Sequence, residues 1–313
     1  SARFKKEKTD FFLLCGGSLG GKARGLAFAR SMIKQSGIKK EFEHVTIRVP
    51  NCAVVGTDEF DQFMKDNHLW EKALKITDNK KLERAFKKAR LSIDLKLKLG
   101  SFIQDHKYPL AIRSSSLLED SQYQPLAGTY ETIMLPNNSR SNKKRLNELV
   151  TAIKRVFAST FKGEAKSLLD NTAHRIEEEK MAVIIQEVVG QPYESKRFYP
   201  TFSGVLKSIN YYPVSYMKRD EGVVYLALGF GRTIVDGEKC LRISPKYPSI
   251  LPQFFSMKAT EQNSQNQFYG LPLTSINNNS KEDLHPFSLR NAEDDGALKW
   301  VGSVISNDDN TLR

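Results

Sequence analysis

The sequence predicts an α+β protein in which helices and strands follow one another without a regular repeat. Amphipathic segments with helical spacing alternate irregularly with short apolar runs, and strand-like runs stand close together at 181–189, 203–206 and 223–228. A regular parallel sheet would place a helix between successive strands. The irregular order therefore favours α+β over a parallel βαβ fold.

The first part of the chain alternates short strands with helices. Residues 11–14 are an apolar, strand-like run before a glycine-rich stretch, and 23–34 has the i, i+3, i+4, i+7 apolar spacing of a helix. The β-rich run 45–49 stops at Pro50, and a second short strand follows at 53–55.

Two helices are expected next. Thr57 stands three residues ahead of Phe60, which is the spacing of an N-cap, and Asp58 suits the positive end of a helix. Residues 80–104 carry one continuous amphipathic pattern, which predicts a single long helix. The other expected elements are strands at 110–113, 127–135, 181–189, 203–206 and 223–228, a helix at 147–164 and a polar loop or linker at 261–280.

The composition describes a globular, basic chain. Of its 313 residues 40% are apolar and 27% are charged, and the formal net charge is +12. No apolar run reaches the ~18 residues of a membrane helix, and the N-terminus lacks the apolar region of a signal peptide. The cysteines Cys15, Cys52 and Cys240 are too widely spaced for a disulfide framework or a zinc site. We therefore expect a cytoplasmic protein that does not enter a membrane.

The positive charge favours an anionic partner, which is a nucleic acid, a nucleotide or an acidic protein. The basic runs at 39–40, 80–81 and 143–145 are short, lie among acids and lack interleaved aromatic residues. Because no nucleic-acid reading module accompanies them, we do not expect direct nucleic-acid binding.

The glycine-rich stretch at 16–22 leaves three interpretations open. Gly16, Gly21 and Lys22 match the G-x-x-x-x-G-K of a P-loop, but Ala23 stands where that motif needs the hydroxyl that binds Mg²⁺. The glycines could also serve only to allow a tight turn. In the third interpretation, backbone N–H groups at a helix start form, with Lys22, another kind of phosphate site.

Two further stretches point to an anionic ligand. Arg113 ends a buried strand and is followed by serines at 114–116, which together supply a forked cation and short donors suited to phosphate. The alternative is an ion pair of Arg113 with Glu119 or Asp120. The apolar strand 181–189 ends in a Gln–Glu–Val–Val sequence that could hold an adenine, although most such strands are simply core.

These stretches belong to a longer series of motifs. From about residue 14 to 240 the chain contains GGK at 20–22, VP at 49–50, AIRSS at 111–115, LAG at 126–128, MAVIIQ at 181–186, SGV at 203–205 and GFG at 229–231. The series resembles the N-terminal nucleotide-binding domain of phosphoenolpyruvate synthase and pyruvate phosphate dikinase, which has an ATP-grasp-type fold. That family is similar to rifampin phosphotransferase and glucan, water dikinase.

The resemblance implies an ATP site in which Lys22 is a phosphate lysine, so that Ala23 needs no hydroxyl. It implies that Lys22 and Arg113 are the catalytic residues and contact the ATP phosphates, and that Mg²⁺ is a cofactor. The other implied ligand-binding residues are Gly20, Gly21, Ser114 and Ser115 at the phosphates, Ala127, Gly128 and Thr129 in a loop that covers the phosphates, and Gln186, Glu187 and Val189 along the adenine.

The resemblance also implies a reaction and a larger parent chain. ATP, pyruvate and water would give AMP, phosphoenolpyruvate and phosphate, and the phosphohistidine and pyruvate-binding domains would lie elsewhere on the parent chain. The metal ligands are not identified, since the acids at 293–295 and 308–309 look like solvated loop residues. We therefore expect a C-terminally truncated domain that is inactive alone. The alternative is a non-catalytic ATP-sensing or protein-interaction module derived from this family.

The expected organisation has three parts. An N-terminal lobe at 1–110 carries the Lys22 loop, and a central ATP-grasp-like lobe spans 111–240. The segment 241–313 is unlike the family and contains the polar linker at 261–280.

Overall fold

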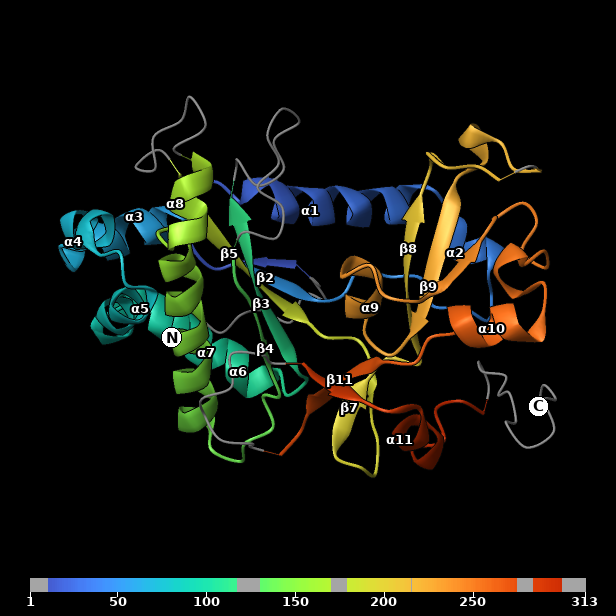
Figure 1. The fold of residues 1–313 in the computed structure, drawn as a ribbon. Coiled ribbons are helices and arrows are strands. Elements are labelled where there is room, and N and C mark those ends of the chain that lie inside the picture. The colour runs from blue at the N-terminus through green and yellow to red at the C-terminus, as the bar shows by residue number, and fades with distance from the viewer. Residues whose placement is uncertain (1–10, 117–129, 170–178, 215, 275–283, 300–313) are drawn as a thin grey trace. The chain divides into compact units, whose positions relative to one another are not determined.

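The computed structural model describes residues 11–116, 130–169, 179–214, 216–274 and 284–299 (Figure 1). The chain divides into two compact units, residues 1–188 and 189–313. The lobe boundaries that we expected near residues 110 and 240 stay a prediction. Among the described residues, no helix combines the length and the apolar character needed to cross a bilayer.

The first unit is built on a five-stranded sheet with the strand order β1-β2-β5-β3-β4. The strands are β1 (Phe11–Leu13), β2 (Cys52–Val55), β3 (Leu110–Ser116), β4 (Thr132–Leu135) and β5 (Met181–Glu187). Strands β1 and β2 are parallel, and the other neighbours are antiparallel. The apolar β5 lies in the centre, as expected for a strand that is buried on both faces.

One face of this sheet carries the larger core. It packs against α3 (Thr57–Asp66), α5 (Asn79–Lys88), α6 (Ile93–Asp105) and α7 (Asn142–Ser159). The centre of the core is aromatic, with the rings of Phe60 and Phe157 in edge contact at 5.2 Å between centroids. Three shorter helices complete the described part of the unit: α2 (Ile38–Glu41), α4 (Trp70–Lys75) and α8 (Gly163–Leu169).

The opposite face carries a smaller core under one long helix. This helix, α1 (Gly20–Gln35), buries Ala23 completely against Cys52, Val54 and Ile184. Because side chains alternate across a strand, the residues aligned with Val54 and Ile184 in neighbouring strands share the α1 face. Arg113 is one of them, since it pairs with Ile184 in the register of β3 and β5.

Two expected helices have different bounds in the structure. The single helix predicted at 80–104 is broken into α5 and α6, and the Ser92 hydroxyl caps α6 by accepting a hydrogen bond from the Leu95 N–H at 3.1 Å. The helix expected at 147–164 begins earlier, at Asn142, where Ser141 caps it, and it ends at Ser159 before α8 begins.

Three expectations around the early strands also differ. Residues 45–49 form no strand, and the Val45 N–H instead bonds back to the Phe42 carbonyl in a turn. Thr57 is not an N-cap but the first residue of α3, after Gly56. The strand expected at 127–135 is β4 from Thr132 onward, and its start lies outside the described residues.

The second unit contains two antiparallel sheets, with the strand orders β10-β9-β8 and β12-β11-β7-β6. The strands are β6 (Gln191–Pro192), β7 (Arg197–Tyr199), β8 (Phe202–Lys207), β9 (Val223–Leu228), β10 (Leu241–Ile243), β11 (Phe268–Pro272) and β12 (His285–Phe287). The helices are η2 (Arg219–Glu221), α9 (Arg232–Val235), η3 (Pro252–Phe254), α10 (Met257–Asn263) and α11 (Leu289–Asp294).

Two stretches of this unit that looked like solvated loops are structured. The polar stretch 261–280 contains the end of α10 and the strand β11. This strand is buried because Phe268 and Tyr269 give it apolar side chains. Asp295 is not solvated: its side chain is 2% exposed, accepts a hydrogen bond from the Tyr199 hydroxyl at 2.8 Å and pairs with Arg197 at 3.3 Å. Its role is to hold β7 within the unit.

Candidate functional site

The glycine-rich loop between β1 and α1 is fixed against the start of α3. The Ser18 N–H donates to the Thr57 hydroxyl at 2.9 Å, and the Thr57 N–H donates to the Ser18 carbonyl at 3.1 Å. The Asp58 N–H adds a hydrogen bond to the Gly16 carbonyl at 3.3 Å. Thr57 is therefore the residue that positions this loop, a role that its N-cap spacing did not indicate.

Two glycines of the loop are required by the backbone. Gly17 and Gly20 have φ of +93° and +71°, in the left-handed region that favours glycine. A Cβ on Gly20 would lie 1.7 Å from the Ser115 carbonyl oxygen, so no larger residue fits there. The loop thus brings the start of α1 into direct contact with the end of β3.

Ser115 joins the first turn of α1 to β3. Its hydroxyl donates to the Leu19 carbonyl at 2.7 Å and accepts from the Ala23 N–H at 3.0 Å. The Lys22 ammonium, in the same first turn, donates to the Ser114 hydroxyl at 3.3 Å. This turn contains no acidic residue, so the positive end of the α1 dipole and Lys22 act together.

Arg113 lies next to this junction, half-buried on the α1 face of the sheet. Its guanidinium donates to the Gln186 side-chain oxygen at 2.9 Å. The alternative partners that we considered, Glu119 and Asp120, lie outside the described residues. The structure thus brings Gln186, from the proposed adenine strand, into contact with Arg113, from the proposed phosphate site.

Glu187, the last residue of β5, is held by a partner that sequence reasoning missed. Its carboxylate accepts two hydrogen bonds from Arg48, both at 2.7 Å, and a third from the Asn51 N–H at 3.1 Å. Hydrogen bonding from Arg48 is the main cause that lowers the pKa of Glu187. Because 139 positions separate the two residues, no local pattern in the sequence indicates the pair.

The other expected site residues are less informative. Gly20 and Gly21 form the start of α1. Val189 follows β5, is 52% exposed and is the first residue of the second unit. Ala127, Gly128 and Thr129 lie outside the described residues.

The two thiols near the site are unreactive at neutral pH. Burial is the main cause that raises the pKa of Cys15 and of Cys52 to about 11. The positive charge of Arg113 acts on Cys52 in the opposite direction without overcoming this effect. Both groups therefore stay protonated, and neither is a candidate nucleophile.

The described residues contain no group of three or more His, Cys, Asp or Glu side chains that could hold a metal ion. What they contain at the α1–β3 junction is a helix N-terminus and two cations, Lys22 and Arg113, with Ser115 bonded to the first turn of α1. Such a set suits an anion with several oxygens, and its donors fit a phosphate chain better than a metal.

Two comparisons with known proteins identify the family. A curated relative from Bacillus subtilis (strain 168), described as the uncharacterized phosphotransferase YvkC, is 28% identical over 192 residues. The match covers 60% of this chain but 20% of the relative, so the chain spans a small part of that protein's length. The family described as "Pyruvate phosphate dikinase, AMP/ATP-binding domain" matches residues 17–282. This range includes Lys22, Arg113 and Gln186, and the chain therefore belongs to the pyruvate phosphate dikinase AMP/ATP-binding domain family.

Proposed function

We propose that the α1–β3 junction binds the phosphate chain of ATP and that the domain presents this ATP for phosphoryl transfer. The observation that carries the proposal is the hydrogen bond from Lys22, in the first turn of α1, to Ser114, which follows Arg113 in β3. Family membership supports a nucleotide as the ligand. Phosphoryl transfer depends mainly on positioning and on stabilisation of charge, and these groups supply both.

The two cations have different parts in this proposal. Lys22 is a point charge at the positive end of α1, where it stabilises the terminal phosphates by charge. Arg113 offers a planar fork, and its bond to Gln186 fixes the direction in which that fork points. Ser115 contributes by holding the helix start in place, because both of its hydrogen bonds are already used within the protein.

For the adenine we propose the end of β5 and the residues that follow it. The carboxylate of Glu187 is engaged by Arg48 and Asn51, and its N–H donates to the Asn51 carbonyl at 2.8 Å, so Glu187 would meet the base through its backbone carbonyl. Gln186 is 8% exposed, so its side chain would line the site in a fixed position. Val189 would supply apolar surface.

We propose that Mg²⁺ binds together with the phosphates of ATP. Such an ion would need only one or two protein carboxylates beside the phosphates. The chemistry it supplies is neutralisation of phosphate charge. Lys22 and Arg113 hold the phosphates that would carry it.

The finer assignments rest on the family and the relative. We propose an ATP-grasp-type fold and the reaction of phosphoenolpyruvate synthase, in which ATP, pyruvate and water give AMP, phosphoenolpyruvate and phosphate. The family's description names pyruvate phosphate dikinase, and the relative is described as a phosphotransferase. We further propose that the 313 residues bind the nucleotide but need phosphohistidine and pyruvate-binding domains of a parent chain to complete the transfer.

A thermal-shift panel of ATP, ADP, AMP, pyruvate and phosphoenolpyruvate at ~0.15 M salt tests the proposal, because the salt screens non-specific attraction of anions. A ligand that binds only the folded state raises the melting temperature. We expect a shift with the adenine nucleotides and none with pyruvate or phosphoenolpyruvate. A shift with phosphoenolpyruvate and none with ATP would overturn the assignment.

A further inference from the structure

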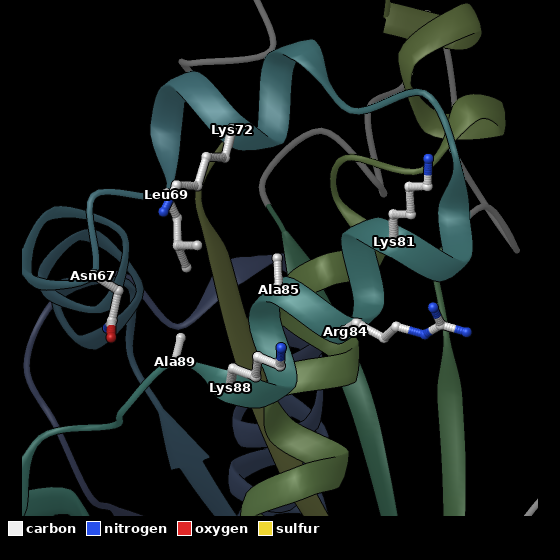
Figure 2. Close-up of a pocket in the computed structure, with 8 residues that line it drawn as sticks. All are labelled: Asn67, Leu69, Lys72, Lys81, Arg84, Ala85, Lys88 and Ala89. Atoms are coloured by element: carbon white, nitrogen blue, oxygen red, sulfur yellow. The ribbon is translucent and has the colours of Figure 1, made fainter.

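The first unit contains a second feature suited to anions, on the side of the sheet away from α1. A pocket of about 450 Å³ lies along α5, beside α4 and the end of α3 (Figure 2). Its floor is small and apolar, formed by Leu69, Ala85 and Ala89. The glycine loop contacts Thr57 and Asp58 at the start of α3, whereas the pocket is lined by Asn67, just after the end of α3, so the length of this helix lies between them.

The rim of the pocket is basic. It is formed by Lys72, Lys81, Arg84 and Lys88, and all four side chains are exposed. The last three recur at i, i+3 and i+7 along α5, so they follow one face of the helix. Figure 2 shows these charged ends spread apart, with Lys81 and Arg84 directed away from Leu69 and Ala89.

The acids near this rim are occupied elsewhere. Glu71 pairs with Lys75 at 2.5 Å, and Glu83 pairs with Lys87 at 2.7 Å. Asp78 caps α5 by accepting hydrogen bonds from two backbone N–H groups, at Lys80 and Lys81. Within the part of the chain that the structure describes, none of the four rim cations forms an ion pair. The charge of Asp78 acts on Lys81 and Arg84 and offsets part of theirs, so the rim keeps a net positive field.

The pocket also has a fixed frame. The Asn67 side chain, at its edge, donates to the carbonyls of Phe63 and Arg90, both at 2.9 Å, and accepts from the Arg90 N–H at 2.8 Å. These bonds tie the end of α3 to the segment after α5. The floor residues Leu69 and Ala89 are buried, at 3% and 8% exposure, so the hollow is a property of the packed core.

We propose that this pocket binds a small ligand that carries several phosphate groups, at a site separate from the glycine loop. Its volume lies in the range of about 300–1,000 Å³ that is usual for small-ligand sites. The spread of four cations matches several anionic groups better than one. The lining residues that the structure describes include no aromatic side chain on which a nucleobase could stack, which favours a small ligand over single-stranded nucleic acid.

Inorganic tripolyphosphate is the probe. Every protein in the experiment carries Lys22→Ala, because this substitution should weaken the binding of tripolyphosphate at the glycine loop. Calorimetry without Mg²⁺ at ~0.15 M salt should show one binding site in this background. Adding Lys81→Ala and Lys88→Ala should weaken binding by about tenfold or more, since each removes a charged hydrogen-bond donor. The matched control adds Lys39→Ala and Lys40→Ala on α2, two exposed lysines that remove the same charge away from the pocket. Its affinity should stay within about twofold.

Three results would overturn the proposal. One is the absence of binding heat in the Lys22→Ala background. Another is an equal loss of affinity in the two double-lysine variants, which would mean attraction to net charge alone. The third is pocket-dependent binding of a single-stranded oligonucleotide without binding of tripolyphosphate. The substituted lysines are exposed, so unchanged thermal unfolding is expected and serves as the check that all variants fold.

Discussion

Glu187 and Arg48 form a bidentate ion pair, with both N–O distances at 2.7 Å, that ties the end of β5 to the segment ahead of β2. The pair stands at the last residue of β5, whose preceding residue, Gln186, contacts Arg113. It therefore anchors the same strand end that we propose for the adenine. Its effects on stability and on binding can be separated.

Because of the Glu187–Arg48 ion pair, we expect part of the free energy of unfolding to depend on pH. The pKa of Glu187 is lowered in the folded protein, so its contribution is fully present above the unfolded value of about 4.3 and is lost as pH falls through the folded value. Glu187→Gln should lower the free energy of unfolding at pH 7 by about 1.5–3 kcal/mol, and the difference should shrink as pH falls below about 4.3. Urea unfolding at pH 7 and at a series of lower pH values measures this. Glu71→Gln, in an exposed pair with Lys75, is the control and should change little.

Lys22 and Arg113 should both contribute to nucleotide affinity. Replacing either by Ala should weaken ATP binding by roughly 1.5–3 kcal/mol, the range for hydrogen bonds to charged groups. Calorimetry on the wild type and both variants measures the change, with Lys39→Ala as a control for net charge. Unchanged ATP affinity in both variants would mean that ATP does not bind at the α1–β3 junction.

Gly20 and Gly37 allow backbone strain to be separated from crowding. Both have a positive φ, of +71° and +70°, but only at Gly20 would a Cβ collide with a neighbour, the Ser115 carbonyl. Gly37→Ala should therefore cost roughly 1–2 kcal/mol of unfolding free energy, while Gly20→Ala should cost roughly 2–5 kcal/mol. Denaturant unfolding compares the two. Equal costs would mean that the start of α1 does not pack on Ser115 as described.

The thiols of Cys15 and Cys52 should alkylate slowly. With the pKa of each raised to about 11, the thiolate fraction at pH 8 is on the order of 100-fold below that of a free cysteine with a pKa of about 8.5. Iodoacetamide labelling followed by peptide mass measurement gives each rate, with a short cysteine peptide as reference. Labelling as fast as the peptide would show that these thiols are not buried.

Several strands could be predicted because their own residues determine them. The apolar run around Ile184 and the run 223–228 predicted β5 and β9, and both are confirmed. The break between α5 and α6 was hidden because Ala89 and Leu91, inside the break, are buried and continue the amphipathic pattern. The strand β11 was missed for the opposite reason, since its few apolar residues stand among polar neighbours.

The candidate site could be predicted only where a motif marks it. Lys22 and Arg113 were proposed as site residues because glycines and serines accompany them in the sequence, and this assignment stays a prediction. Arg48 and Thr57 were missed as site-positioning residues because their partners, Glu187 and Ser18, lie far along the chain. Contacts of this kind depend on how the strands are ordered, which local patterns do not determine.

The order of strands in the first sheet has a consequence for synthesis on the ribosome. Strand β5 lies between β2 and β3, so these earlier strands lack the partner that joins them until residue 187 has emerged. Lys22 and Arg113 are made long before that point, but the sheet that supports both cannot close. Long-range pairing of this kind is slow and leaves strand edges exposed in the meantime. The nascent chain therefore carries every phosphate-binding residue that we assign to the junction well before it can hold a nucleotide.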